Sequence, residues 1–173
     1  VYRSVIGHGL AFHPLANFAR LNTLVLARDD EAARALAVAL ILRGEPVGKS
    51  LVWEYYFPYG SGTPPWTSGM VQAVAAQAIA RVGQHLGDLE LLNAASAAFD
   101  GVAGLTMKRP EGPWVELYDF DHGVVLNAQL QTVISLSDYA AITGSKPAAR
   151  LAARMRAAAA TLLPRFDTGC WSL

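Results

Sequence analysis

The sequence repeats one pattern three times: two stretches with apolar residues at helical spacing, followed by a turn-rich segment that carries a tryptophan. The predicted helices cover residues 14–28, 29–44, 66–87, 88–105, 124–144 and 146–164. The tryptophans Trp53, Trp114 and Trp171 are 61 and 57 residues apart. Because one amphipathic hairpin cannot bury its apolar face alone, the repeat predicts helical hairpins stacked side by side.

Residues typical of helix ends support these boundaries. We expect Pro14 in a first turn, Asp29, Thr67 or Ser68, and Asp88 as N-caps, and Gly44 as a C-cap. Amide side chains also recur in the first turns of the first helix of each hairpin. They are Asn17, Gln72, Asn127 and Gln129.

The linkers select among the possible all-α folds. Each second helix precedes a long stretch rich in glycine, proline and aromatic residues, longer than a plain solenoid needs. Long loops at one end of a rigid scaffold often build a site. We therefore predict one domain over residues 1–173, an α/α toroid with short β-like segments at one mouth.

Three hairpins are half of a common six-hairpin ring. The ring is small, or the chains pair as a homo-oligomer, or part of the protein is absent from this sequence. The start at Val1, with no signal-like region, favours part of a longer chain.

Composition excludes several classes of function. The net charge is zero, so a basic nucleic-acid footprint is absent, and 53% hydrophobic residues argue against disorder. No apolar stretch is long enough for a membrane span. The single cysteine and the spacing of the four histidines predict no zinc site, and we expect no cofactor. The excess of arginine over lysine suggests a bacterial source and leaves an exported or cell-envelope location open.

The segment WVELYDF, residues 114–120, suggests chemistry. If it is extended, its side chains alternate between two faces. One face would hold Trp114, Glu116, Tyr118 and Phe120, and the other Val115, Leu117 and Asp119. With WEYYF at residues 53–57, it would form an aromatic cleft suited to a sugar ring. The alternative is structural: the tryptophans plug the ring, and Glu116 with Tyr118 is an edge pair.

Three motifs resemble the D-glucuronyl C5-epimerase family over roughly residues 12–173. WVELYDFDHGVVLN resembles its Trp-Tyr-Glu-Glu-Tyr-Pro segment with the following Val-Leu-Asn. PPWTSGMVQ resembles its Trp-x-Ser-(Gly/Ala)-Met-x-Gln helix start, and LPRFDTG its Leu-Pro-x-Tyr-Asp-Thr-Gly segment. The resemblance implies a helical α/α barrel.

The resemblance also implies epimerisation at C5 of hexuronic acid residues in a polysaccharide, by proton abstraction and return. It assigns Tyr118 to the family's catalytic tyrosine, Glu116 to the first of its paired acids, and Asn127 to an asparagine near the substrate. An acidic polysaccharide or oligosaccharide is the expected partner. The predicted substrate-binding residues are Trp114, Asn127, Tyr55, Tyr59, Trp66, Gln72 and His13.

The sequence departs from the family pattern at two positions. Leu117 replaces the second acid and Phe166 replaces a tyrosine, and the family has further tyrosines beyond the last matched segment. These departures keep two alternatives open. One is a non-catalytic carbohydrate-binding domain or subunit. The other is a different α/α-barrel carbohydrate enzyme: a lyase could use Tyr118, and a glycoside hydrolase would need a carboxylate pair such as Glu54 and Glu116.

Overall fold

The computed structural model describes residues 1–167, and within them six α-helices form three hairpins. The prediction of three helical hairpins is therefore confirmed. Trp171 lies outside the described residues. The helices are α1 (Pro14–Leu26), α2 (Asp30–Ile41), α3 (Gly69–Leu86), α4 (Leu89–Val102), α5 (Leu126–Thr143) and α6 (Lys146–Phe166).

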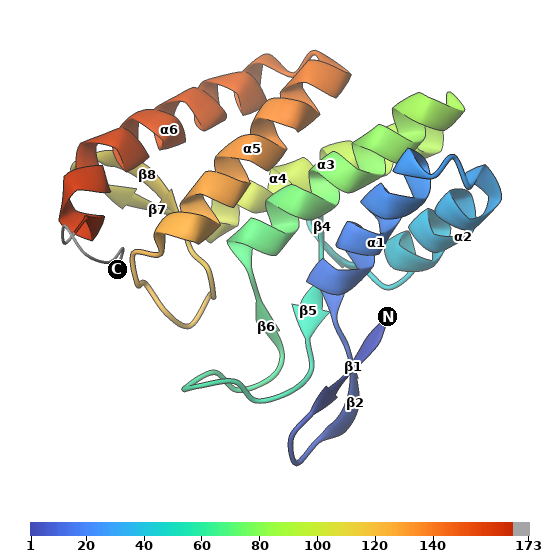
Figure 1. Cartoon of the computed structure of the whole chain (residues 1–173), viewed down its shortest axis with the longest axis horizontal. Coiled ribbons are helices and arrows are strands. Elements are labelled where there is room, and N and C mark those ends of the chain that lie inside the picture. Colours follow the sequence, from blue (N-terminus) through green and yellow to red (C-terminus); the bar gives the residue numbers. More distant parts are fainter. Residues whose placement is uncertain (168–173) are drawn as a thin grey trace.

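The first helices of the hairpins form an inner layer and the second helices an outer layer (Figure 1). Helix α3 packs between α1 and α5, and each inner helix packs against the outer helix of its own hairpin. Alanine lines the buried faces of α3, so neighbouring helices approach closely. The described residues make an arc of an α/α toroid and do not close a barrel.

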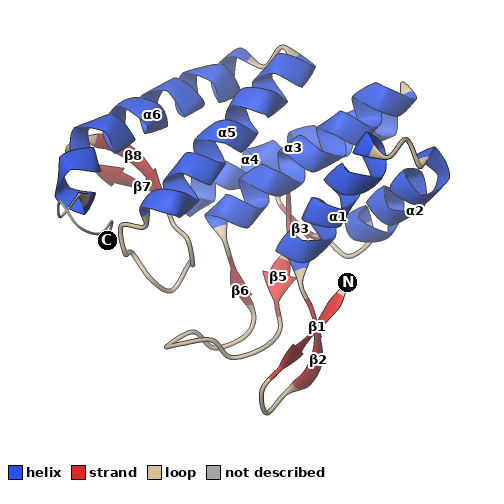
Figure 2. Cartoon of the chain, in the orientation of Figure 1, coloured by secondary structure: helices blue, strands red, loops and turns tan. Residues whose placement is uncertain are grey.

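Four short antiparallel strand pairs accompany the helices (Figure 2). They are β1 (Tyr2–Val5) with β2 (Gly9–Phe12), β3 (Glu45–Val47) with β4 (Ser50–Val52), β5 (Glu54–Tyr55) with β6 (Trp66–Thr67), and β7 (Thr106–Arg109) with β8 (Gly112–Val115). A one-turn 3₁₀ helix (Ala103–Leu105) joins α4 to β7. The β1–β2 hairpin was not predicted from the sequence.

The helix caps follow the sequence with one exception. Asp29, Ser68 and Asp88 are N-caps whose side chains accept backbone N–H groups. Gly44 is not a C-cap, because α2 ends at Ile41 and the chain then turns toward β3. A Cβ at Gly44 would lie 2.6 Å from the Leu51 side chain, so this glycine allows the close approach of β4.

The prediction that WVELYDF is extended throughout is wrong beyond Val115. Strand β8 ends there, and residues 117–120 form a bend and a turn. The Asp119 carboxylate accepts hydrogen bonds from the Thr67 backbone N–H (2.8 Å) and hydroxyl (2.9 Å). This contact ties the turn to the strand before α3.

Buried amides of the inner helices hold the strand pairs β7–β8 and β3–β4 against the helices. Gln129, the fourth residue of α5, is fully buried. Its Nε2 donates to the carbonyls of Pro113 in β8 and Met155 in α6, both at 3.0 Å. Its Oε1 accepts from the Val115 N–H at 2.8 Å. One side chain thus fixes three backbone segments.

The same arrangement recurs at the fourth residue of α3, and the fourth residue of α1 binds the segment before β1. Gln72 Nε2 donates to the carbonyls of Leu51 in β4 (2.6 Å) and Ala98 in α4 (2.8 Å). In α1, the Asn17 amide contacts both the backbone nitrogen and the carbonyl of Val1. Of the four amides noted in the sequence, Asn17, Gln72 and Gln129 therefore hold neighbouring backbone segments, and Asn127 is exposed.

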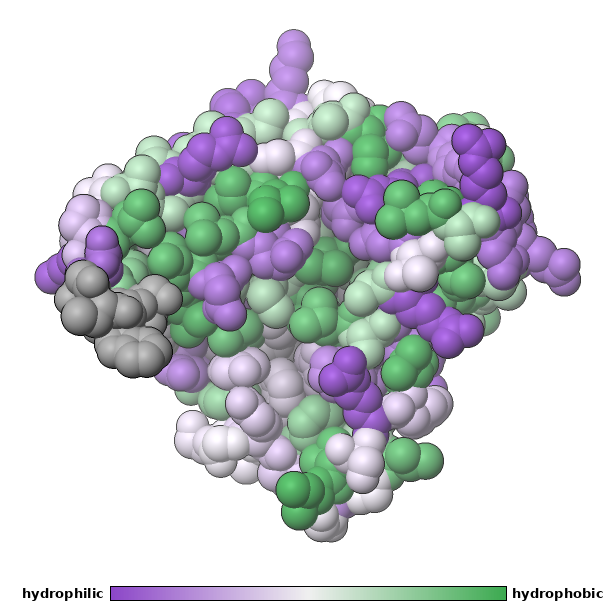
Figure 3. Space-filling model, in the orientation of Figure 1, coloured by the Kyte–Doolittle hydropathy of each residue, from purple (hydrophilic) through white to green (hydrophobic). Residues whose placement is uncertain are grey.

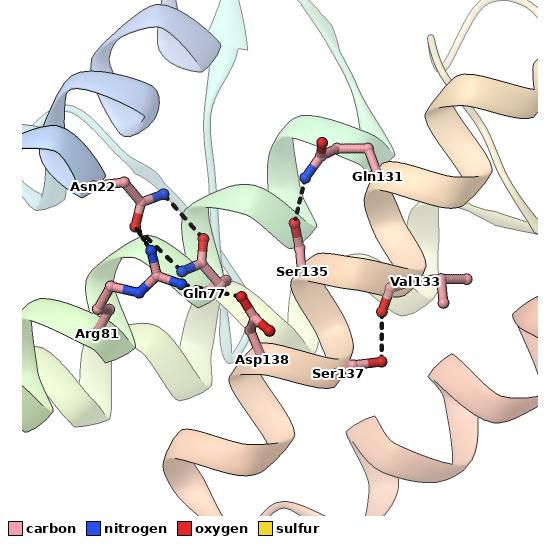
Figure 4. Close-up of polar contacts among 8 residues, drawn as sticks. All are labelled: Asn22, Gln77, Arg81, Gln131, Val133, Ser135, Ser137 and Asp138. Carbon is pink, nitrogen blue, oxygen red and sulfur yellow. Dashed lines mark hydrogen bonds and ion pairs between the residues drawn. The ribbon is translucent and has the colours of Figure 1, made fainter. Parts of the chain in front are cut away.

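A polar cluster joins the three inner helices (Figure 4). The carboxamides of Asn22 in α1 and Gln77 in α3 pair at 3.0 and 3.2 Å. Arg81 in α3 donates to the Asn22 side chain (2.9 Å) and to the carboxylate of Asp138 in α5 (3.0 Å). The cluster fixes the relative positions of α1, α3 and α5.

Replacing Gln129 by methionine should destabilise the protein. The variant keeps the side-chain length but leaves the Val115 N–H and two carbonyls without partners. We expect the free energy of unfolding in urea to fall by about 2 to 4 kcal/mol. The matched control, Gln84→Met on the exposed side of α3, should change it by less than about 0.5 kcal/mol. Equal effects of the two variants would contradict the role of the clamp.

Candidate functional site

An aromatic pocket lies where α1 and α3 begin. The loop between β5 and β6 and the loop after β8 form its other walls, and its volume is about 240 Å³. The residues that line it are His13, Leu15, Tyr55, Phe57, Tyr59, Trp66, Ser68, Met70, Val71, Leu117 and Tyr118. Five of the predicted site residues, His13, Tyr55, Tyr59, Trp66 and Tyr118, thus come together.

Stacked and edge-on rings fix the wall of the pocket. Tyr55 and Trp66, paired across β5 and β6, stack with centroids 4.0 Å apart and planes at 5°. The Trp66 indole N–H donates to the Phe57 carbonyl at 2.7 Å. Tyr118 meets Trp66 edge-on at 5.4 Å. Because the rings hold each other and Trp66 is anchored by a hydrogen bond, the pocket is preorganised.

A close loop contact brings two phenols together. The backbones of Tyr59 and Gly62 pair at 2.8 and 3.2 Å, which makes a tight turn. A Cβ at Gly62 would lie 2.2 Å from the Phe120 ring, so only glycine allows this approach. The Tyr59 and Tyr118 rings are 5.3 Å apart as a result. Tyr59 remains half exposed at the opening.

The environment keeps the Tyr118 phenol protonated. Burial, then the hydrogen bond and charge of Tyr59, then the charge of Asp121 raise its pKa to about 12. Burial is also the main cause that raises the pKa of Tyr55 to about 12. At neutral pH, the Tyr118 hydroxyl is therefore protonated and can donate a hydrogen bond.

His13 presents a second donor to the pocket. It is the N-cap of α1, and its Nδ1 accepts the Ala16 N–H at 3.2 Å. Burial, then the charge of Arg3, lowers its pKa below the usual value. In the neutral ring with Nδ1 accepting, Nε2 carries the proton. The ring lies edge-on to Tyr55, with centroids 5.4 Å apart.

The structure does not bring the other predicted site residues to this pocket. Glu116 pairs with His122 Nδ1 at 3.0 Å. Trp114 is fully buried among α6 residues, away from the pocket. Gln72 is buried in its clamp, and Asn127 lies exposed in the first turn of α5. None of these four lines the pocket.

Phe57 belongs to the segment WEYYF that was predicted to form the aromatic cleft, and it lines the pocket. Sequence reasoning did not assign four other lining residues to the site: Leu15, Ser68, Met70 and Val71. Ser68 and Met70 were noted in a motif, and Ser68 also as a cap, but nothing in an apolar side chain signals a pocket wall. Leu117 was placed on the face opposite Tyr118, yet both line the pocket because the chain bends there.

The described residues, 1–167, contain no group of three or more His, Cys, Asp or Glu side chains that could hold a metal ion. None of their helices has both the length and the apolar character required to span a bilayer.

Comparison with known proteins gives a match to a family and similarities in fold. The sequence model of the family described as D-glucuronyl C5-epimerase C-terminus matches residues 47–173. No curated protein sequence matches the chain. The solved structure of the endo-beta-1,4-glucanase CMCax from Acetobacter xylinum is similar in fold, with a TM-score of 0.68 and 13% identity. The match covers 97% of this chain and 53% of the glucanase, so the chain spans about half its length.

The lowered pKa of His13 gives a prediction about pH. Its NMR titration midpoint should lie below the usual value of about 6.5, and Arg3→Ala should raise it. Because the unfolded chain binds this proton more readily, His13 should also reduce folding stability as the pH falls below that value. Arg34→Ala, on α2, is the control and should leave the midpoint unchanged. A midpoint above the usual value would refute the assignment.

Proposed function

Since this chain belongs to the family described as D-glucuronyl C5-epimerase C-terminus, we propose that it epimerises hexuronic acid residues of an acidic polysaccharide at C5. The family and the fold support a carbohydrate-processing role. The observation that carries the finer proposal is the protonated Tyr118 phenol in the wall of an aromatic pocket. The rings suit the apolar C–H face of a sugar.

The chemistry assigns roles to the donors of the pocket. A base outside the described lining residues takes the C5 proton, which is α to the carboxylate, and later releases it to solvent; negative charge develops on the carboxylate oxygens when the proton leaves. The Tyr59 hydroxyl and His13 Nε2–H can donate to those oxygens. Tyr118 then gives its phenolic proton to C5 from the opposite ring face, and the phenolate recovers a proton from solvent.

The lack of a carboxylate among the described lining residues supports a second candidate function. None of the described residues lining the pocket is an acid, Leu117 occupies the position of the family's second acid, and Glu116 pairs with His122. A pocket of aromatic rings and neutral donors also suits a non-catalytic carbohydrate-binding domain, which needs no base.

The two remaining alternatives differ in support. A hydrolase would need two carboxylates across one bond. Glu54 accepts a hydrogen bond from Tyr56 at 2.6 Å, Glu116 pairs with His122, and neither lines the pocket. That pair therefore does not support hydrolysis here. A lyase would share the proton abstraction step and release an unsaturated sugar.

Epimerisation should incorporate solvent deuterium at C5. In D₂O with a heparan-type glucuronate polymer, we expect NMR to show C5 deuterium. Tyr118→Phe should lower the rate at least a hundredfold, because loss of a general acid costs about 10²- to 10⁴-fold. Tyr56→Phe, an exposed tyrosine outside the pocket, is the matched control.

The outcomes separate the candidates. No exchange by the unaltered chain contradicts epimerisation. Full exchange by Tyr118→Phe excludes its proposed role. Release of an unsaturated product would instead indicate a lyase.

Binding can be tested independently of turnover. Tyr59→Ala removes an exposed ring from the pocket opening and should weaken polymer binding in calorimetry by about three- to tenfold, the effect of one aromatic contact. Tyr56→Ala removes a similarly exposed ring outside the pocket and should not. Equal losses would place the binding surface elsewhere.

A further inference from the structure

The described lining of the aromatic pocket carries no carboxylate and no permanent cation. Burial lowers the pKa of His13 and raises that of Tyr118 to about 12, so both are neutral at neutral pH. The loop between β5 and β6, residues 56–65, contains no charged residue. Strongly hydrophilic residues are sparse over this loop and the β1–β2 hairpin on the face that Figure 3 shows. Selection of an anionic sugar over a neutral one therefore needs a charge beside the lining.

The β1–β2 hairpin places Arg3 next to His13. Arg3 pairs with Ala11 across the two strands, and the His13 N–H continues the ladder by donating to the Val1 carbonyl at 3.4 Å. The His13 backbone is extended. His13 is therefore the diagonal neighbour of Arg3 on one face of the hairpin, a distance that a long side chain can reach.

This face of the hairpin packs against the pocket walls. Val5 and Ala11 lie on it and contact the core cluster that contains Tyr55, Phe57 and Trp66. All three of these aromatic residues line the pocket. The face that carries Arg3 is thus the face toward the pocket.

The opposite face of the hairpin has its own arginine. Tyr2 and Phe12 lie there and meet edge-on, with ring centroids 6.2 Å apart. The Arg43 guanidinium lies 4.3 Å from the centre of the Phe12 ring and donates to the Tyr2 hydroxyl at 3.5 Å. Arg43 is therefore held away from His13 by these two rings.

The charge of Arg3 is available to a ligand. Its side chain is exposed, and none of the described acids forms an ion pair with it. Burial first, and then the charge of Arg3, lowers the pKa of His13. The same charge acts on the Tyr55 phenol, against the larger effect of burial. Two lining residues thus experience this cation.

The opposite wall has the opposite charge. Burial, then Tyr59, then the charge of Asp121 raise the pKa of Tyr118. Asp121 is exposed and accepts the Gly123 N–H at 2.9 Å. The other acids of this loop have partners of their own. An anionic ligand is therefore attracted to the His13 side of the pocket and repelled from the Asp121 side.

We propose that Arg3 is a specificity-determining residue of this pocket, whose guanidinium binds the carboxylate of the uronate beside His13. A planar guanidinium suits a carboxylate, because two parallel N–H groups can bind its two oxygens. This contact also orients the sugar, because the Asp121 side repels the same carboxylate. The inference rests on the proposed binding of an acidic polysaccharide in the pocket, and it does not require epimerisation.

Calorimetry with two polymers tests the proposal. One is an unsulfated glucuronate polymer, and the other is the same polymer with its carboxylates reduced to alcohols. Arg3→Gln should raise the dissociation constant of the acidic polymer about five- to tenfold and change that of the reduced polymer less than about twofold. Arg150→Gln removes an exposed arginine from α6, outside the pocket, and should change neither constant. Circular dichroism checks that both variants are folded.

A second measurement locates the contact. A short glucuronate oligosaccharide should raise the NMR titration midpoint of His13, because a carboxylate beside it favours the charged imidazole. In Arg3→Gln, half of this change should require about five- to tenfold more oligosaccharide. A His13 midpoint that does not respond to the oligosaccharide would overturn the proposed place of the carboxylate.

The outcomes separate this inference from the proposed function. Equal losses with the two polymers, or equal effects of Arg3→Gln and Arg150→Gln, would overturn the role of Arg3 and leave the proposed function standing. No binding of the acidic polymer by the unaltered chain would overturn both. Binding that depends on Arg3 without deuterium exchange at C5 would support the inference and contradict epimerisation alone.

Discussion

The buried amide at the fourth residue of each inner helix is the contact on which the rest of the structure depends. A strand pair of two to four residues per strand is not stable alone, and the loops after it carry the pocket. Gln129 attaches β8 to α5 and α6, and Gln72 attaches β4 to α3 and α4. Both amides are buried, so unpaired groups would be costly and each strand has one favourable position. The loops that form the pocket therefore leave the scaffold at fixed points.

The helices could be predicted because their signals are local. Apolar spacing and the caps Asp29 and Asp88 are read within a few residues. The course of the WVELYDF segment could not be predicted, because it depends on contacts with residues that are far away in the sequence. The last paired residues of β7 and β8 are Thr106 and Val115, and the next backbone bond, from the Glu116 N–H, goes to the Leu105 carbonyl of the 3₁₀ helix at 3.0 Å. Beyond that point, Asp119 binds Thr67, a residue 52 positions away. Local alternation carries no trace of such a contact.

The candidate site was predictable in its aromatic half. Tyr55, Tyr59 and Trp66 follow from the segments after the first hairpin, and Tyr118 from the second. Gln72 shows why polar residues were harder to assign. An amide near a helix start can bind a ligand or satisfy buried carbonyls, and the sequence is the same in both cases. Only burial, 1% exposure for Gln72, distinguishes them.

The charge balance of the pocket limits what it can do. Its described titratable groups are His13 and three tyrosines, and the pKa shifts found among them keep His13, Tyr55 and Tyr118 neutral at neutral pH. Neutral donors stabilise a carboxylate whose charge grows during proton removal, and they repel no anionic polymer. They do not supply a strong base. In the proposed function, these groups bind the uronate and return the proton. The removal of the first proton requires a group beyond these rings, which is why the epimerase and binding proposals diverge at this step and not at substrate recognition.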